Sequence, residues 1–132
     1  MARILIVDDE EKILSLYSKF LRQAGHEVLT ASSAQKGLDM AVSAQPNLIL
    51  LDVMMPFVDG TEAQTNLAEN ASTKHIPVIF LTSLLKEGEV NDAQGEIGGH
   101  EFISKSTPNA KIVAWVKEAR AAALARPRPR FR

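Results

Sequence analysis

The chain has 132 residues, of which 45% are hydrophobic and 23% charged, and it contains no cysteine. This composition suits one globular domain with a hydrophobic core, and it excludes a disulfide-stapled scaffold, thiolate chemistry and an intrinsically disordered chain. The N-terminus lacks the pattern of a secretion signal, and no apolar stretch approaches the roughly 20 residues that span a bilayer. We therefore expect a soluble, cytoplasmic protein with no membrane partner.

Charge is unevenly distributed along the chain, whose net charge is −1. The segment 126–132 alternates arginine with proline or phenylalanine and carries four positive charges, which leaves −5 for residues 1–125. Alternating arginine and proline favours an extended, self-repelling tail over packed structure. We expect one folded domain over residues 1–124 and a disordered basic tail over residues 125–132. The tail is interpreted first as a solubilising end or linker and second as a contact for nucleic acid or an acidic partner.

The first half of the chain alternates short apolar runs with amphipathic stretches. Short, continuously apolar runs are typical of strands buried on both faces, and a 3.6-residue apolar period is typical of a helix. Serine before a helix, and glycine or proline after one, mark the boundaries. These signals predict a strand at Arg3–Val7, a helix at Glu10–Ala24 ended by Gly25, a strand at Glu27–Ala31, and a helix from Ser32 or Ser33 to about Ala44, before Pro46.

The second half continues this alternation, with one weak region. Strands are predicted at Asn47–Leu51, Pro77–Thr82 and Glu101–Lys105, and helices at Thr61–Glu69 and from Asn109 to about Leu124, after a Thr107-Pro108 start. Residues 86–99 hold four of the seven glycines, and each glycine inside a helix costs about 1 kcal/mol relative to alanine. Any helix there is expected to be short. The order βαβαβαβαβα predicts an α/β fold with an open, mostly parallel sheet and helices on both faces.

Four of the predicted strands end in a reactive side chain. Asp8 and Asp9 follow the first strand, Asp52 follows the third, and Thr82 and Lys105 end the fourth and fifth. In open α/β sheets ligands gather at the carboxyl ends of the strands, so these groups are expected to converge. Each has a structural alternative when taken singly, such as helix capping by Asp8 or Asp9. Their joint occurrence favours a functional site.

The residue types at this edge suit phosphoryl chemistry. Three carboxylates in one pocket repel, which calls for a hard divalent cation, a carboxyl group that keeps its proton, or both. Mg²⁺ prefers oxygen ligands and leaves positions for water or phosphate. A lysine and a hydroxyl can hold the remaining oxygens of a phosphoryl group, and a carboxylate in line with that group can accept it. The pattern therefore predicts a Mg²⁺-assisted phosphoacceptor site.

At these residues the chain resembles a response-regulator receiver domain of the CheY-like superfamily, which serves two-component signalling. The resemblance covers residues 1 to about 124. It is carried by four segments: Ile4–Glu10, Leu48–Gly60, Pro77–Ser83 and Phe102–Lys105. It implies a flavodoxin-like (βα)5 fold, with five parallel strands in the order 2-1-3-4-5 and helices on both faces.

The resemblance also implies a role for each site residue. Asp52 would be the phosphoacceptor. Asp9 and Asp52 would bind Mg²⁺ together with the backbone carbonyl of Met54, and Asp8 would act through a water molecule. Lys105 would pair with the phosphoryl oxygens. No organic cofactor is implied.

The resemblance further implies a switch. Thr82 would hydrogen-bond a phosphoryl oxygen, and Phe102 would turn inward when Thr82 moves, although Phe102 is also a plausible core residue. The surface of residues 86–106 would then change for a partner. Two features depart from the family pattern. Ser106 follows Lys105 where proline, often with a cis bond, is usual, and Gly98-Gly99-His100 replaces the usual Gly-Ala-Asp-like stretch before the fifth strand.

These expectations combine into a phosphorylation-activated signalling switch. A sensor histidine kinase or phosphotransfer protein would dock near Leu14 on the first helix and donate from a phosphohistidine, and an unknown protein would be the downstream target. The chain would catalyse only its own phosphotransfer and dephosphorylation, so we do not expect an enzyme in the usual sense. Outside the tail its net negative charge disfavours direct binding to DNA.

Two alternatives belong to other functional classes. A Mg²⁺-dependent aspartyl-phosphate phosphohydrolase resembling the haloacid-dehalogenase group would carry a second acid two residues after its nucleophile. Met54 stands at that position after Asp52, and Glu10, at that position after Asp8, lacks the threonine that usually follows in that group. A flavin-binding module is disfavoured because the first loop is acidic and repels phosphate. The scattered histidines match no metal-ligand spacing and are expected in surface or loop roles: His26, His75 and His100.

Overall fold

The computed structural model describes residues 2–52, 60–82, 96–97, 100–104, 110–114 and 116–117. Strands and helices alternate through most of this part of the chain. The elements are β1 (Arg3–Val7), α1 (Glu11–Gln23), β2 (Glu27–Ala31), α2 (Ala34–Ala44), β3 (Leu48–Asp52), α3 (Gly60–Glu69), β4 (Val78–Thr82), β5 (Glu96–Ile97) and β6 (His100–Ser104). Residues 110–114 and 116–117 are helical.

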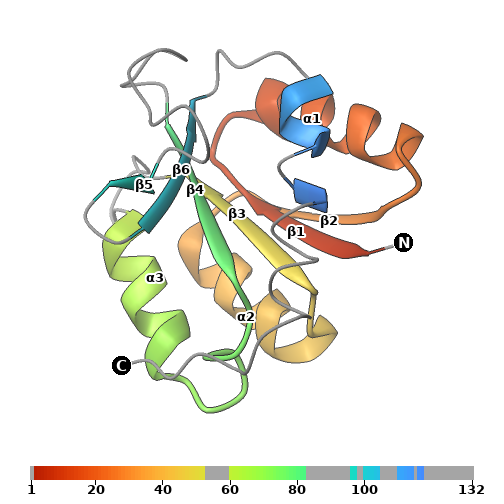
Figure 1. The fold of residues 1–132 in the computed structure, drawn as a ribbon. Helices are drawn as coiled ribbons and strands as arrows, with labels where there is room; N and C mark the ends of the chain where they lie inside the picture. Colours follow the sequence, from red (N-terminus) through yellow and green to blue (C-terminus); the bar gives the residue numbers. More distant parts are fainter. Residues whose placement is uncertain are drawn as a thin grey trace.

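The described strands form one sheet in the order β2-β1-β3-β4-β6-β5. All pairs are parallel except β5 with β6, which is antiparallel. The sheet crosses the middle of the molecule, with α1 and the helical residues near the C-terminus on one face and α2 and α3 on the other (Figure 1). The predicted α/β class, the helices on both faces and the strand order 2-1-3-4-5 are confirmed, the predicted fifth strand being β6.

Alternate residues of each central strand contact opposite layers of helices. Ile4 and Ile6 of β1 pack with α1 and the C-terminal helical residues, whereas Leu5 and Val7 pack with α2 and α3. The four residues are at most 1% exposed. Burial on both faces explains why the parallel strands read as continuous apolar runs in the sequence.

The helix boundaries follow the predicted signals closely. The side-chain hydroxyl of Ser33 accepts a hydrogen bond from the backbone N–H of Lys36 and caps α2. After α1, Gly25 has φ of +98°, a conformation that a side chain would strain. The predicted end of α2 near Ala44 is confirmed, and Gln45 follows it in the left-handed conformation with φ of 49°. Its side-chain amide donates to the carbonyls of Ala41 and Ser72, which holds it there.

One element was not predicted. Within the glycine-rich segment 86–99, Glu96–Ile97 forms a two-residue strand that pairs antiparallel with β6. So short a strand has too few residues to show an alternating pattern. The predicted tail at 125–132, the domain boundary at 124 and most of the predicted last helix lie outside the described residues.

Candidate metal and phosphoacceptor site

The sheet register brings the predicted acids together. Val7 of β1 pairs with Leu51 of β3, so Asp8 and Asp52 occupy the next positions of two adjacent strands. Oxygen atoms of Asp8, Asp9 and Asp52 all lie within 4.8 Å of one another. Asp8 is 0% exposed and Asp52 is 3% exposed, whereas Asp9 is exposed to solvent. The result is a carboxylate cluster with two buried members and one member open to solvent.

Asp8 is held firmly by its neighbours. Its backbone N–H donates to the carbonyl oxygen of Ala31 over 3.1 Å, which extends the pairing of β1 with β2 by one residue. Its side-chain Oδ1 accepts a hydrogen bond of 2.8 Å from the backbone N–H of Glu10. Glu10, not Asp8 or Asp9, is the N-cap residue of α1. The capping alternative for the two aspartates is therefore not what the structure shows.

The donor set fits a hard divalent cation. Carboxylate oxygens are the ligands that Mg²⁺ and Ca²⁺ prefer, and Mg²⁺ is usually held by one or two carboxylates with water or phosphate in its other positions. Oxygen atoms within 4.8 Å of one another can face a single ion. Burial of like charges in a region of low dielectric constant is costly without a counter-charge. The cluster is therefore suited to a cation with an accessible side at Asp9.

The backbone places Thr82 at the same edge of the sheet and Phe102 two residues before the end of β6. Asp52 pairs with Leu81, so Thr82 lies one position beyond Asp52 on the adjacent strand β4. Phe102 lies on β6, the strand next to β4, and pairs with Phe80 of β4. The expectation that the aromatic residue occupies the strand beside that of Thr82 is met by this pairing. The side chains of Thr82 and Phe102 lie outside the described part of the structure.

The remaining predicted residues lie either outside the described residues or away from the carboxylate cluster. Lys105 directly follows β6, whose last residue Ser104 pairs with Thr82. Met54, Lys105 and the Lys105–Ser106 peptide lie outside the described residues, and their predicted roles stay predictions. Of the histidines, His26 accepts a hydrogen bond at Nδ1 from the backbone N–H of Ala2, far from the acids.

Comparison with known proteins identifies the family to which this fold belongs. The chain matches the response regulator receiver domain over residues 4–117. It belongs to that family. PilH of Pseudomonas aeruginosa is 35% identical over 106 residues, which cover 80% of this chain and 86% of PilH. The structure of a CheY-like receiver domain protein from Methanospirillum hungatei superposes with a TM-score of 0.79 at 26% identity, covering 95% of this chain and 98% of that one.

Other relatives of this receiver domain are longer proteins. The chain is 39% identical over 119 residues to RpaA of Synechocystis, a DNA-binding transcriptional regulator, and spans 89% of itself but 48% of RpaA. It spans 25% of the response regulator PleD of Caulobacter vibrioides, at 38% identity. Within the described residues, no helix combines the length and apolar character needed to cross a membrane.

Proposed function

We propose that this receiver domain is a signalling switch that accepts a phosphoryl group on Asp52 in the presence of Mg²⁺. The observation that carries the proposal is the cluster of Asp8, Asp9 and Asp52 at the carboxyl edge of the sheet, with oxygen atoms within 4.8 Å of one another. Membership of the receiver domain family supports it. The donor would be a phosphohistidine of a sensor histidine kinase or of a phosphotransfer protein.

Each acid would have a distinct role. Asp9 and Asp52 would hold the cation with the backbone carbonyl of Met54, and Asp8 would act through a water molecule. When bound, Mg²⁺ would neutralise the negative charge that gathers on the transferring group. An oxygen of Asp52 would form a bond to phosphorus as the bond from phosphorus to the donor nitrogen breaks, leaving a neutral histidine and an aspartyl phosphate.

The side chains around Asp52 would then interact with the new negative charge. A phosphoryl group adds strong acceptor oxygens. Lys105 would pair with one of them, and Thr82, one position beyond Asp52 on the adjacent strand, would donate its hydroxyl to another. Movement of Thr82 would leave room for Phe102 on β6. The surface of residues 86–106 would change as a result and bind a downstream protein.

The domain would act as a switch and not as a turnover enzyme, catalysing only its own phosphotransfer and dephosphorylation. A kinase would approach α1 near Leu14, which is buried and lies at one edge of the apolar stripe of that helix. Apart from the basic tail the chain is net acidic, so this domain itself would not bind DNA directly. Any DNA contact would come from another protein or domain.

The test is labelling with acetyl phosphate and Mg²⁺, followed by intact-mass spectrometry. We expect one added phosphoryl group, removal of that group by hydroxylamine, and no labelling after chelation of the metal. Asp52→Asn should abolish labelling because the amide is not a nucleophile for this transfer. Asp39→Asn, which alters an exposed acid on α2, is the matched control and should label like the unaltered chain.

The same preparation separates the switch from the alternative phosphohydrolase. Stoichiometric, slowly reversed labelling supports the switch. Sustained hydrolysis of p-nitrophenyl phosphate that is lost in Asp52→Asn would instead support a phosphohydrolase. Labelling that persists undiminished in Asp52→Asn would refute Asp52 as the acceptor.

A further inference from the structure

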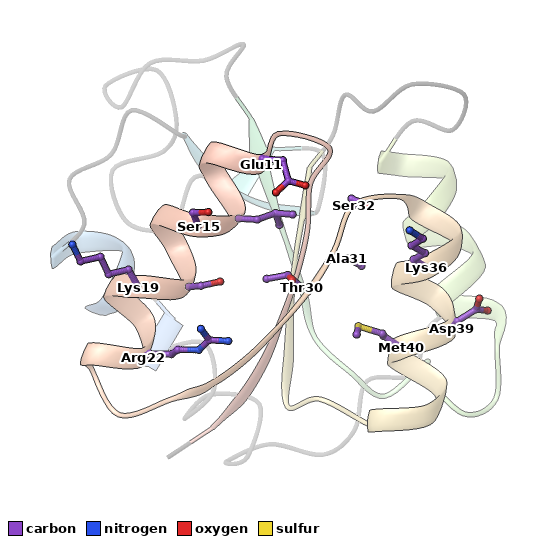
Figure 2. Close-up of a pocket in the computed structure, with 12 residues that line it drawn as sticks. Glu11, Ser15, Lys19, Arg22, Thr30, Ala31, Ser32, Lys36, Asp39 and Met40 are labelled. Carbon is purple, nitrogen blue, oxygen red and sulfur yellow. The ribbon is translucent and has the colours of Figure 1, made fainter.

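A groove follows the outer edge of β2, away from the acidic site. Its volume is about 810 Å³, and it is bounded by α1 on one side and α2 on the other. Figure 2 shows Ser15, Lys19 and Arg22 on α1 and Lys36 and Met40 on α2, with Thr30–Ser32 between the two helices. Sequence reasoning missed this groove, because its lining residues are neither clustered in the chain nor chemically unusual.

The floor of the groove is a strand edge with hydrogen-bonding capacity. Among the described strands, β2 is the terminal one beside β1. The N–H of Glu27 and the carbonyl of Ala31 bond to the β1 side. Because successive residues of a strand direct their backbone groups to opposite edges, Val28 and Thr30 direct theirs outward.

The two outward-facing residues differ. The guanidinium group of Arg22 donates to the carbonyl of Val28 over 3.1 Å, so it covers the first half of the edge. Thr30 lies in the groove lining, whereas Val28 does not. The open stretch therefore runs from Thr30 to Ser32. An extended segment could add there as a further strand, a known mode of peptide recognition.

Charge in the groove favours an acidic occupant. Its lining includes the cations Lys19, Arg22 and Lys36 and the acids Glu11 and Asp39. Asp39 accepts a hydrogen bond from the side-chain amide of Gln35 over 3.0 Å, and in Figure 2 it points away from the strand. Lys19 also points away from the strand in Figure 2. Of the other charged lining residues, Arg22 and Lys36 are positive and Glu11 is negative, so the charge that faces an occupant is net positive.

Charge and hydrogen-bonding capacity disfavour two other occupants. In a symmetric pair, a second copy of the chain would bring the same net positive charge of Arg22, Lys36 and Glu11 against this groove. The C-terminal segment of this chain carries four arginines with proline between them. It would face the cations of the groove, and its prolines lack the N–H groups that strand addition needs.

We propose that the β2-edge groove (the groove lined by α1, Thr30–Ser32 and α2) binds an extended, acidic segment of a partner protein by strand addition. The site lies outside the acid cluster and does not depend on phosphorylation of Asp52. It would give the domain a docking surface separate from the proposed output surface at residues 86–106. Its lining includes Leu14, near which the kinase is proposed to approach.

The test uses the full chain labelled with ¹⁵N and a short peptide that alternates valine with glutamate. We expect saturable shifts of the amide signals of Thr30 and Ser32. A peptide with lysine in place of glutamate should bind at least about fivefold more weakly, because it meets like charge. Methylating alternate backbone nitrogens along one edge of the peptide should abolish binding, and methylating those along the other edge should not.

Charge reversal gives the matched pair of variants. The variant Lys36→Glu reverses the sign of the charge that faces the groove, and it should bind the lysine peptide more tightly than the glutamate peptide. Lys74→Glu changes an exposed lysine that is not part of the groove lining and should keep the original preference. The exposed position of Lys36 makes loss of folding an unexpected result, and far-ultraviolet circular dichroism checks it.

Several outcomes would overturn the proposal. They are the absence of saturable shifts at Thr30 and Ser32, equal affinity for both peptides, and indifference to methylation of either edge. Shifts of the same amides on raising the concentration of the chain alone would indicate a second copy. Shifts on replacing the tail arginines by serine would indicate the chain's own tail. The Asp52→Asn variant should still bind the peptide, so this proposal and the phosphoacceptor can fail separately.

Discussion

The buried carboxylates of Asp8 and Asp52 face the exposed carboxylate of Asp9 across less than 4.8 Å. Two unit charges about 4 Å apart repel by about 4 kcal/mol at an effective dielectric constant near 20. The fold tolerates this repulsion because β1 and β3 are fixed by apolar residues on both faces. A site arranged for a cation is thus expected to lower the stability of the metal-free domain.

The first prediction follows from this repulsion. Asp8→Asn should raise the free energy of unfolding of the metal-free chain by about 1–2 kcal/mol, since it removes one buried like charge. An asparagine oxygen can still accept the hydrogen bond from the N–H of Glu10. The same variant should weaken Mg²⁺ binding at least about tenfold. Urea unfolding with chelator present, and calorimetric titration with Mg²⁺, measure the two effects.

Higher stability of the metal-free chain together with weaker Mg²⁺ binding is the result that distinguishes a cation site from a structural role of Asp8. Asp39→Asn removes an exposed acid on α2 and should change neither quantity appreciably. A metal-free Asp8→Asn chain that is less stable than the unaltered chain would show that Asp8 is chiefly a structural residue.

The sequence was sufficient to predict which acids meet, because each directly follows or ends an apolar run that only a buried strand explains. It could not predict the inequality among them. Asp9 is exposed while Asp8 is buried. This difference depends on the path of the chain between β1 and α1. Nor could it predict that the N–H of Glu10 would bind Asp8, since that contact needs the turn between β1 and α1. The predicted roles of the Thr82 and Phe102 side chains stay predictions.

At the scale of elements, the close contact between α2 and β1 depends on a glycine. A Cβ atom added at Gly37 would lie 2.7 Å from Cγ2 and 3.0 Å from Cγ1 of Val7. Val7 is 1% exposed and directly precedes Asp8. The packing of α2 is therefore coupled to the strand that carries the acids.

The second prediction tests this contact. Overpacking costs about 1–3 kcal/mol, and the higher helix propensity of alanine returns about 1 kcal/mol. Gly37→Ala should therefore lower the free energy of unfolding by about 1 kcal/mol and also weaken Mg²⁺ binding. Ser43→Ala in the same helix, at an exposed position, serves as the control and should do neither. Urea denaturation measures the difference in stability.

A double-mutant cycle completes the test. Val7→Ala removes the atoms that the new Cβ would meet, so Gly37→Ala should cost less in the Val7→Ala background than in the unaltered chain. Additive costs would show that the contact with Val7 does not limit this position.

Elements with long, regular patterns were predictable, and those fixed by tertiary contacts were not. The strand β1 and the helix α1 agree with the predicted ranges within one residue at each end. The strand β5 has only two residues and depends on pairing with β6. Similarly, the left-handed Gln45 at the end of α2 depends on its bond to Ser72, far along the chain. Local sequence carries no signal for such contacts.

At the scale of the whole molecule, the candidate cation site exists only in the folded chain. Asp8 and Asp9 are far from Asp52 in the sequence and meet only when β1 pairs with β3. The strand order follows from the resemblance to receiver domains, whereas alternation of strands and helices alone predicts a parallel sheet and leaves its order open. The strand order therefore determines the site, because the pairing that buries Leu50 and Leu51 also brings the acids together.

The third prediction is that Mg²⁺ stabilises the domain by linkage. A ligand that binds only the folded state adds about 2.7 kcal/mol to the free energy of unfolding at a concentration of 100 times its Kd. We expect the thermal midpoint to rise with Mg²⁺ concentration and, above the Kd, to keep rising with the logarithm of that concentration. The same ionic strength supplied as NaCl should not reproduce the rise, since screening acts little on buried charges. A midpoint that follows ionic strength alone would mean that the acids bind no cation specifically. Asp8→Asn should flatten the Mg²⁺ dependence while starting from a higher midpoint, because the cation and the substitution relieve the same repulsion.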